Sequence, residues 1–347
     1  MTKTELLTTT KSVEQYDPGR DRLFHSATHE EILNGATTDI YFVKSYDILR
    51  HLGLLETEVV AEIFTSREGI ACGIEECINL LRVTGVKVWS VKEGHHFKEK
   101  EVILRISGPY GRFGLYETCL LGMLASASAW ATAAKECKEA CNGKYFLCFG
   151  ARHVHPAVAP VMERAAVVGG AAGASCILGA KLLGLRPSGT VPHAVIIIAG
   201  DTVRVARAYD EIMDESSPRI ILVDTFKDEA EESLRVAEAL KEHLLGVRLD
   251  TPGERGGVTP ALVAEVRARL DQAGYRYVKI FVSGGLTPER ISVLSEAGAD
   301  AFGVGSYISG AKPIDMTMDI KEVEGKPVAK RGRIPGITYN PALERRL

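Results

Sequence analysis

The sequence predicts an α/β protein, an irregular α/β barrel joined to a smaller N-terminal α+β domain that the C-terminal tail rejoins. Three observations support this class. From Lys144 onward, short apolar runs alternate with amphipathic helical patterns, as in a parallel sheet with crossover helices. Before residue 110, apolar residues recur with a period of two on both sides of Glu93-Gly94, which indicates a β-hairpin. Near residue 300, two successive strand patterns finish in glycine-rich turns.

These patterns divide the chain into four parts. We expect an N-terminal α+β domain at residues 1–113, a bridging helix at 114–143, an α/β barrel at 144–310 and a returning tail at 311–347. The first part holds a helical segment that ends near Leu52, and a strand-turn-helix pattern follows it. The bridge is rich in alanine, and the tail sequence MDIKEVEGKPVAKRG is typical of a hairpin.

The barrel is predicted from seven apolar runs with helical patterns between them. The helices at residues 228–243 and 260–273 each carry one apolar stripe, as helices packed on strands do. A chain of 347 residues with 46% hydrophobic residues is sufficient for a barrel and a smaller domain. The predicted strands are residues 145–149, 175–178, 194–198, 220–223, 247–249, 278–282 and 301–304.

The last two predicted strands lead into turns that favour a phosphate. One ends in Ser283-Gly284-Gly285, ahead of a helix that starts at Thr287-Pro288, and the next ends in Gly303, Gly305 and Ser306. Either turn alone could be only a tight connection, because glycine is conformationally permissive. In a parallel barrel both turns lie on one face, where main-chain N–H groups attract a phosphate. We therefore expect a phosphorylated ligand at this face.

Polar side chains follow the other predicted strands. Arg152 and His153 follow the first strand, Asp224 and Asp250 each follow a later strand, and a shaped loop carries His193. Each position has a structural alternative: the aspartates could cap helices, Arg152 and His153 could form a rim ion pair, and His193 could be a core histidine. Because strand ends share one face of a barrel, we expect these residues in one site.

Composition argues against several classes of partner. The net charge of −3 gives no electrostatic reason to expect nucleic acid or an acidic membrane surface. The sequence has no charge-free apolar run of about 18 residues, and its polar start lacks the apolar core of a signal peptide. Seven scattered cysteines fit a reducing compartment, and no second Cys or His pair completes Cys137 and Cys141 as a zinc site. We expect a cytoplasmic protein without structural zinc.

A set of short motifs carries a family resemblance. They are Thr38-Asp39-Ile40-Tyr41-Phe42, Phe149-Gly150-Ala151-Arg152, Ser188-Gly189-Thr190-Val191-Pro192-His193-Ala194, Val223-Asp224-Thr225, Arg248-Leu249-Asp250-Thr251, Ser283-Gly284-Gly285 and Phe302-Gly303-Val304-Gly305-Ser306. Each motif alone is weak, whereas the ordered set, from residue 38 to 306, is specific. The chain resembles the nicotinate phosphoribosyltransferases, type II phosphoribosyltransferases related in fold to the quinolinate and nicotinamide enzymes.

The resemblance implies how substrates are bound. Phe149 and, from the neighbouring subunit of a homodimer or higher oligomer, Tyr41 would sandwich a pyridine ring. Arg152 and Arg248 would meet the nicotinate carboxylate or the phosphates of phosphoribosyl pyrophosphate, since a planar guanidinium pairs bidentately with an anion. The substrate-binding residues are then Tyr41, Phe149, Arg152, His153, Thr190 and Arg248, and the 5′-phosphate would bind Ser283, Gly284, Gly285, Gly303, Gly305 and Ser306.

The resemblance also implies the catalytic residues His193, Asp224 and Asp250. Asp250, together with Asp224, would hold the ribose hydroxyls or a Mg²⁺ ion. Asp250 is the candidate metal ligand. His193 resembles the histidine that ATP phosphorylates in this family, a role that suits imidazole near physiological pH. Mg²⁺ is the expected cofactor and ATP a co-substrate.

The resemblance implies that the protein forms nicotinate mononucleotide and pyrophosphate from nicotinate and phosphoribosyl pyrophosphate, with ATP hydrolysis through a phosphohistidine, in NAD salvage. Quinolinate phosphoribosyltransferase is an alternative, although it must bind two carboxylates and needs no phosphorylated histidine. Nicotinamide as substrate and a non-catalytic phosphosugar-binding barrel are further alternatives. A barrel aldolase is disfavoured because no lysine at a strand end has a Schiff-base setting.

Overall fold

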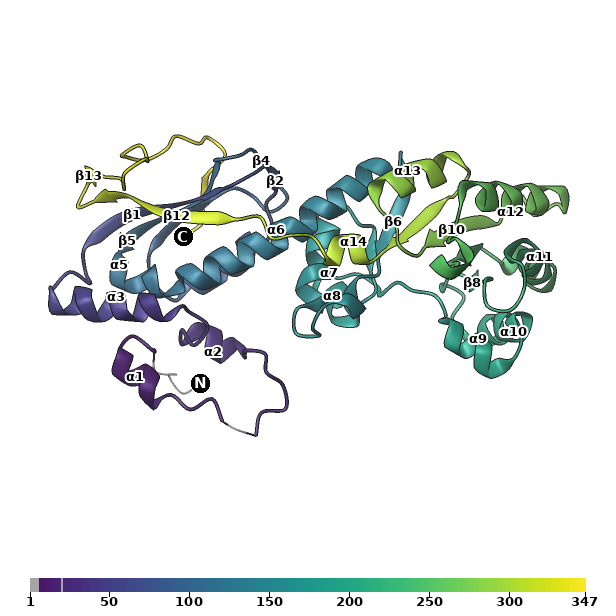
Figure 1. Cartoon of the computed structure of the whole chain (residues 1–347), viewed down its shortest axis with the longest axis horizontal. Coiled ribbons are helices and arrows are strands. Elements are labelled where there is room, and N and C mark those ends of the chain that lie inside the picture. The colour runs from purple at the N-terminus through teal and green to yellow at the C-terminus, as the bar shows by residue number, and fades with distance from the viewer. Residues whose placement is uncertain (1–5, 20) are drawn as a thin grey trace. The chain divides into compact units, whose positions relative to one another are not determined.

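The computed structural model describes residues 6–19 and 21–347, so part of the polar N-terminal start lies outside the described residues. The chain forms two compact units (Figure 1). The first contains Met1–Ala131 and Lys312–Leu347, and the second is Thr132–Ala311. The helix α6 (Glu117–Ala140), predicted as the bridge, begins in the first unit and ends in the second.

The first unit is built on an antiparallel sheet of six strands in the order β13-β12-β1-β5-β3-β14. The tail strand β12 pairs with β1 along its length, and β14 pairs with β3. The prediction that the C-terminal tail rejoins the N-terminal domain is therefore confirmed. The bounds are β1 (Glu58–Thr65), β3 (Lys87–Ser90), β5 (Val102–Pro109), β12 (Met316–Val323), β13 (Lys326–Pro327) and β14 (Glu344–Arg345), with β2 (Gly69–Ile70) and β4 (His96–Phe97) forming a separate pair.

Helices accompany this sheet. In α4 the apolar residues Ile74, Cys77, Ile78 and Leu81 recur at helical spacing and are all buried, as expected for one apolar face. The predicted segment that ends near Leu52 is α3, and it is strongly exposed along much of its length. The helices of this unit are α1 (Thr10–Gln15), α2 (His29–Leu33), α3 (Ile40–His51), α4 (Ile74–Arg82) and α5 (Tyr110–Phe113).

The second unit holds a parallel sheet of six strands in the order β7-β6-β11-β10-β9-β8. The edge strands are β7 and β8, so the sheet is an open half-barrel, which confirms the predicted irregular barrel class. The strands are β6 (Tyr145–Cys148), β7 (Gly173–Ala174), β8 (Ile220–Leu222), β9 (Gly246–Leu249), β10 (Lys279–Ser283) and β11 (Ala301–Val304). The helices are α7 (Ala159–Val168), α8 (Ile177–Leu182), α9 (His193–Ala199), α10 (Thr202–Ile212), α11 (Glu229–Leu240), α12 (Pro260–Gln272), α13 (Pro288–Glu296) and α14 (Ser306–Ser309).

Two of the predicted barrel strands are wrong. Residues 194–198 lie in α9, and residues 175–178 run into α8, with β7 reduced to Gly173–Ala174. Short apolar runs do not distinguish a strand from a helix by periodicity. In α9 only Ile196 is buried, whereas Ile198 is 85% exposed, so this run is not a core strand.

The predicted turn after β10 forms as its sequence indicates. The Thr287 side chain accepts a hydrogen bond from the backbone N–H of Arg290, and Pro288 is the first residue of α13. The helix ends before Gly298, whose φ of +111° favours glycine, and β11 follows. This unit places both glycine-rich turns at the carboxyl end of neighbouring strands.

Candidate active site

Arg248 is the centre of a hydrogen-bonded cluster at the carboxyl end of the parallel sheet. Its Nε donates to Ser283 Oγ at 3.0 Å, its Nη1 to Thr190 Oγ1 at 2.6 Å and its Nη2 to Asp250 Oδ2 at 3.1 Å. Ser283 Oγ in turn donates to Asp250 Oδ1 at 2.7 Å. Strands β9 and β10 are paired, which brings these side chains together. The guanidinium is thus held in one orientation by groups from two strands and one loop.

Phe149 lies against a position that only glycine can fill. A Cβ atom at Gly303 would stand 2.4 Å from the Phe149 ring, closer than any real side-chain contact. The guanidinium carbon of Arg248 lies 5.7 Å from the ring centroid, within the range of a cation–π interaction. The ring that the sequence suggested as a stacking partner is therefore fixed beside the cationic cluster.

His193 and Asp224 form a hydrogen-bonded pair at the neighbouring strand end. His193 is the first residue of α9, and its Nε2 lies 3.0 Å from Oδ2 of Asp224, which follows β8. The His193 side chain is 38% exposed, whereas that of Asp224 is fully buried. Burial raises the pKa of Asp224 above its usual range, and the hydrogen bond from His193 opposes that shift.

Neither predicted aspartate is a helix cap. The side chain of Asp228 caps α11, and that of Thr259 caps α12. Asp250 instead accepts from Arg248 and Ser283, so both of its oxygens are engaged. The structural alternative considered for the aspartates is therefore wrong.

Few side-chain oxygens of this site are available to coordinate a magnesium ion. Asp224 Oδ1 is buried and has no hydrogen-bond partner among the described residues, so it is a carboxylate oxygen that no protein group engages. No group of three or more His, Cys, Asp and Glu side chains within residues 6–19 and 21–347 could hold a metal ion. Because Mg²⁺ is usually held by one or two carboxylates and by substrate phosphates, Asp224 fits such a partial site better than the fully engaged Asp250.

Both predicted phosphate turns require glycine for steric reasons. Gly284 and Gly285 have φ values of +93° and +58°, which favour glycine. A Cβ at Gly305 would lie 2.8 Å from Cε1 of His153 and 2.9 Å from the carbonyl oxygen of Phe149. The His153 ring therefore lies against the Gly305 turn, which leads into Ser306, the first residue of α14.

The remaining predicted residues are less constrained. Arg152 lies in the short helical turn Ala151–His153 and is exposed, and no ion pair joins it to a residue that the structure describes. Its guanidinium is therefore available to an anion. Tyr41 belongs to the first unit, on α3, where it is 55% exposed.

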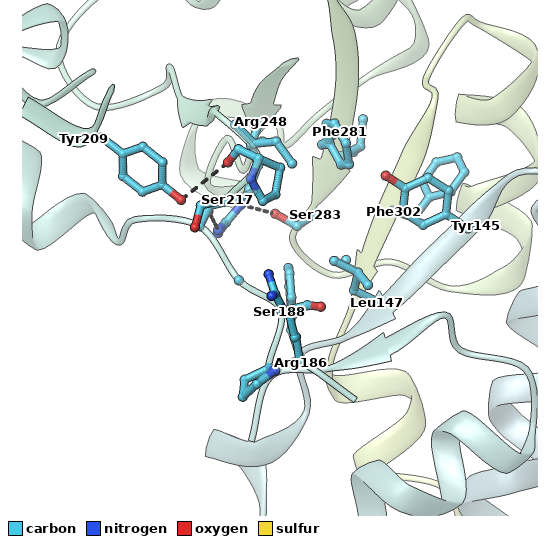
Figure 2. A pocket seen from close by; sticks show the side chains of 18 of the residues that line it. Tyr145, Leu147, Arg186, Ser188, Tyr209, Ser217, Arg248, Phe281, Ser283 and Phe302 are labelled. Carbon is cyan, nitrogen blue, oxygen red and sulfur yellow. Dashed lines mark hydrogen bonds between the residues drawn. The ribbon is translucent and has the colours of Figure 1, made fainter. Parts of the chain in front are cut away.

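A cavity of about 340 Å³ opens beside the Arg248 cluster (Figure 2). Five predicted residues line it, namely Phe149, Thr190, Arg248, Ser283 and Gly303. The lining also includes residues outside the predicted site, Tyr145, Arg186, Ser188, Tyr209, Ser217 and Phe281 among them. Figure 2 shows Tyr209 and Ser217 on one side of the cavity and Tyr145 with Phe302 on the other. Part of the lining, including Tyr209 and Ser217, thus lies outside every sequence motif.

The two halves of the chain match known protein domains. Residues 39–128 match the quinolinate phosphoribosyl transferase N-terminal domain, and residues 130–319 match the C-terminal domain of the same family. The fold is thus that of a type II phosphoribosyltransferase. The chain is a member of the quinolinate phosphoribosyl transferase family, to which its motifs related it by fold.

The similar proteins include a nicotinate-nucleotide pyrophosphorylase as well as nicotinate phosphoribosyltransferases. A nicotinate-nucleotide pyrophosphorylase from Pyrococcus furiosus is 46% identical, with a TM-score of 0.87 over 91% of this chain and 82% of that one. Nicotinate phosphoribosyltransferase pncB1 of Mycobacterium tuberculosis is 30% identical over 69% of this chain and 54% of its own length. Human nicotinic acid phosphoribosyltransferase shares the fold, with a TM-score of 0.68 at 19% identity, over 86% of this chain and 77% of that one.

The chain spans about half the length of the curated relatives that it matches. Among the described residues, no helix is both long and apolar enough to cross a membrane.

Proposed function

We propose that this protein is a nicotinate phosphoribosyltransferase that forms nicotinate mononucleotide and pyrophosphate from nicotinate and phosphoribosyl pyrophosphate in NAD salvage. ATP hydrolysis through a phosphohistidine at His193 would drive the synthesis. The observation that carries the proposal is the His193–Asp224 pair beside the Arg248 cluster. Support comes from the nicotinate phosphoribosyltransferases of Mycobacterium tuberculosis and Bacillus subtilis, which are 29–31% identical to this chain.

The transfer step needs charge stabilisation rather than a protein nucleophile. The pyridine nitrogen attacks the anomeric carbon, a C–N bond forms, and the C–O bond to pyrophosphate breaks. Positive charge develops on the ribose ring, where Asp250 and Asp224 would oppose it, and negative charge develops on the leaving group. Arg152 would bind an anionic group of a substrate, and Mg²⁺, when bound with the substrate, would neutralise pyrophosphate charge.

The ring of nicotinate would stack on Phe149. Arg248 lies over the same ring and has all three of its nitrogens engaged by side chains. It would therefore present a fixed positive charge to the carboxylate of nicotinate. Thr190 accepts the hydrogen bond from Arg248, so its own hydroxyl hydrogen is free to be donated to a substrate.

The ATP-dependent step would take place on His193. An ionised Asp224 carboxylate only accepts hydrogen bonds, so it places the imidazole hydrogen on Nε2 and the lone pair on Nδ1. Nδ1 would attack the γ-phosphorus of ATP and release ADP. Water would later cleave the N–P bond and release phosphate. The half-exposed position of His193 at the start of α9 would allow a nucleotide to approach.

The active form would be a homodimer or a higher oligomer with shared sites. Four large apolar side chains in and beside α3 are 46–60% exposed, namely Ile40, Tyr41, Ile48 and Leu52. Such a stripe would be covered by a second copy of the chain, which would bring its Tyr41 to the partner's pyridine site. None of the seven cysteines is in a disulfide in the part of the chain that the structure describes, and six of them are buried, which fits the reducing cytoplasm as the compartment.

Quinolinate phosphoribosyltransferase is the second candidate. The observation that favours it is the match of both halves of the chain to quinolinate phosphoribosyl transferase domains. The two reactions differ in substrate, in CO₂ release and in ATP use. His193, held by Asp224, has a role only in the ATP-dependent reaction, and this favours the nicotinate enzyme.

A product assay by mass spectrometry tests the proposal. The purified protein is incubated with Mg²⁺ and phosphoribosyl pyrophosphate, together with nicotinate, nicotinamide or quinolinate, each with and without ATP. We expect nicotinate mononucleotide from nicotinate, with more product when ATP is present. Product from quinolinate alone would assign the decarboxylating reaction, product from nicotinamide would change the substrate, and binding without turnover would indicate a phosphosugar-binding protein.

A further inference from the structure

A buried carboxylate outside the predicted site joins two of its strand-end turns. Glu163 lies on α7 and is fully buried. Its Oε1 accepts hydrogen bonds from the backbone N–H of Ala151 at 3.2 Å and from Ser175 Oγ at 2.8 Å. Its Oε2 accepts from the backbone N–H of Cys176 at 2.6 Å. All three donors are neutral groups.

These donors lie on the turns that follow the paired strands β6 and β7. Ala151 immediately precedes Arg152, and Cys176 is the N-cap residue of α8. The residue before Glu163 supports the same turn, because a Cβ at Gly150 would lie 2.7 Å from Cε of Met162. Helix α7 therefore fixes the turn that carries Arg152 through two successive side chains.

Burial of a carboxylate is unfavourable, and a well-packed apolar residue is often as stable or more stable at such a position. Fold stability alone thus gives little reason for a fully buried anion with neutral donors only. The position of its bonds points to a different role, the placement of a turn in the site. Misplacement of a binding group by about 1 Å can reduce a rate by about 100-fold.

We propose that Glu163 is a positioning residue that holds the Ala151–His153 turn so that Arg152 can bind the anionic groups of phosphoribosyl pyrophosphate. The inference rests on the proposed function, because it takes phosphoribosyl pyrophosphate as the ligand. Arg152 itself is exposed and has no ion pair among the described residues, so its placement depends on the backbone that carries it.

Glu163→Gln tests this role with almost no change in shape. An amide has one acceptor oxygen, so glutamine can keep the bonds made by Oε1 or the bond made by Oε2, but not all three. We expect KM for phosphoribosyl pyrophosphate to rise about ten-fold or more, with kcat changed by less than about three-fold. Amide hydrogen exchange in the peptide of residues 149–156 should accelerate. Glu232→Gln is the matched control, because Glu232 is equally buried but pairs with Arg235 of its own helix α11.

A double-mutant cycle with Arg152→Ala separates positioning from general stability. If Glu163 acts through Arg152, the double variant should have the same KM as Arg152→Ala alone. Additive increases in KM, or an unchanged KM in Glu163→Gln, would overturn the inference. Calorimetric binding of phosphoribosyl pyrophosphate is measured in parallel. If the parent protein binds it without turnover, the proposed reaction fails, and the affinity of Glu163→Gln still decides the role of Glu163.

Discussion

His193 and Asp224, 31 residues apart in the sequence, are joined by a hydrogen bond of 3.0 Å between Nε2 and Oδ2. The histidine begins α9 and the aspartate follows β8, so an imidazole at the start of a helix is oriented by a carboxylate just beyond a strand of the sheet. When it is ionised, the fully buried carboxylate only accepts hydrogen bonds and would therefore keep the imidazole hydrogen on Nε2. The nitrogen left with a lone pair is the one that a phosphoryl transfer would use.

Replacement of His193 by alanine should separate synthesis from ATP hydrolysis. We expect the ATP stimulation to be lost while some uncoupled nicotinate mononucleotide synthesis persists, because the transfer step needs no protein nucleophile. Product formation with and without ATP is measured by mass spectrometry. His243→Ala is the matched control, since His243 also bonds to an aspartate, Asp210, at 2.9 Å, but on an exposed surface. Unchanged ATP stimulation in the His193 variant would contradict the phosphohistidine role.

Asp224→Asn should make the folded protein more stable at neutral pH. Burial raises the folded-state pKa of Asp224, so its contribution to stability is fully present below the unfolded pKa and is lost as the pH rises through the folded pKa. Asparagine cannot ionise and can still accept from His193, so the variant should unfold at a higher temperature than the parent protein at pH 7. The difference should vanish below about pH 4, near the ordinary pKa of aspartate. Thermal unfolding across pH 4–8 measures it, and a lower melting temperature of the variant at pH 7 would refute this electrostatic account.

Local signals were sufficient to predict much of this site. The glycine turns, the N-cap at Thr287 and the strand that carries Arg248 are each encoded within a few residues, and the structure brings Thr190, Arg248, Asp250 and Ser283 together. Their contacts were predictable because the ends of parallel strands share one face.

Other features depend on tertiary packing and leave no local signal. The apolar run at residues 194–198 is a mostly exposed helix, which hydrophobicity alone predicts wrongly as a strand. Tyr209 and Ser217 line the cavity without belonging to any motif. Glu163 resembles an ordinary surface glutamate of a helix in the sequence, and only the packing of α7 against two turns shows that it is buried.

Arg248→Lys should be a severe change although it keeps the positive charge. Lysine cannot reproduce a planar fork that donates to Thr190, Asp250 and Ser283 at once. We expect kcat/KM for nicotinate to fall by about 100-fold. Steady-state kinetics measure the loss, with the exposed Arg207→Lys in α10 as a control expected to match the parent protein. A loss of less than about three-fold would mean that charge alone is needed at this position.

Gly303→Ala should displace Phe149. The added methyl group would stand 2.4 Å from the ring, so the ring must leave its position beside Arg248. We expect KM for nicotinate to rise about ten-fold and the protein to lose about 1–3 kcal/mol of stability from overpacking. Gly122→Ala, in α6, is the control, because a Cβ there meets no atom within 4 Å. Wild-type affinity for nicotinate in Gly303→Ala would show that Phe149 does not bind the ring.

Glu117 should make the stability of the first unit depend on pH. Burial first, and then the negative charge of Asp319, raise the pKa of Glu117 to about 7, and Lys330 opposes the shift. The folded protein therefore retains a proton that the unfolded chain releases near pH 4.5, so the free energy of unfolding falls as the pH rises from about 4.5 to 7. Because Glu117 is partly exposed and solvent screens its charge, the free energy of unfolding should fall by about 1–3 kcal/mol over this range.

Glu117→Gln should remove this pH dependence. In denaturant unfolding, the variant should be more stable than the parent protein at pH 8 and equally stable at pH 4.5. Parallel stability profiles of the two proteins across this range would show that Glu117 titrates near its ordinary value.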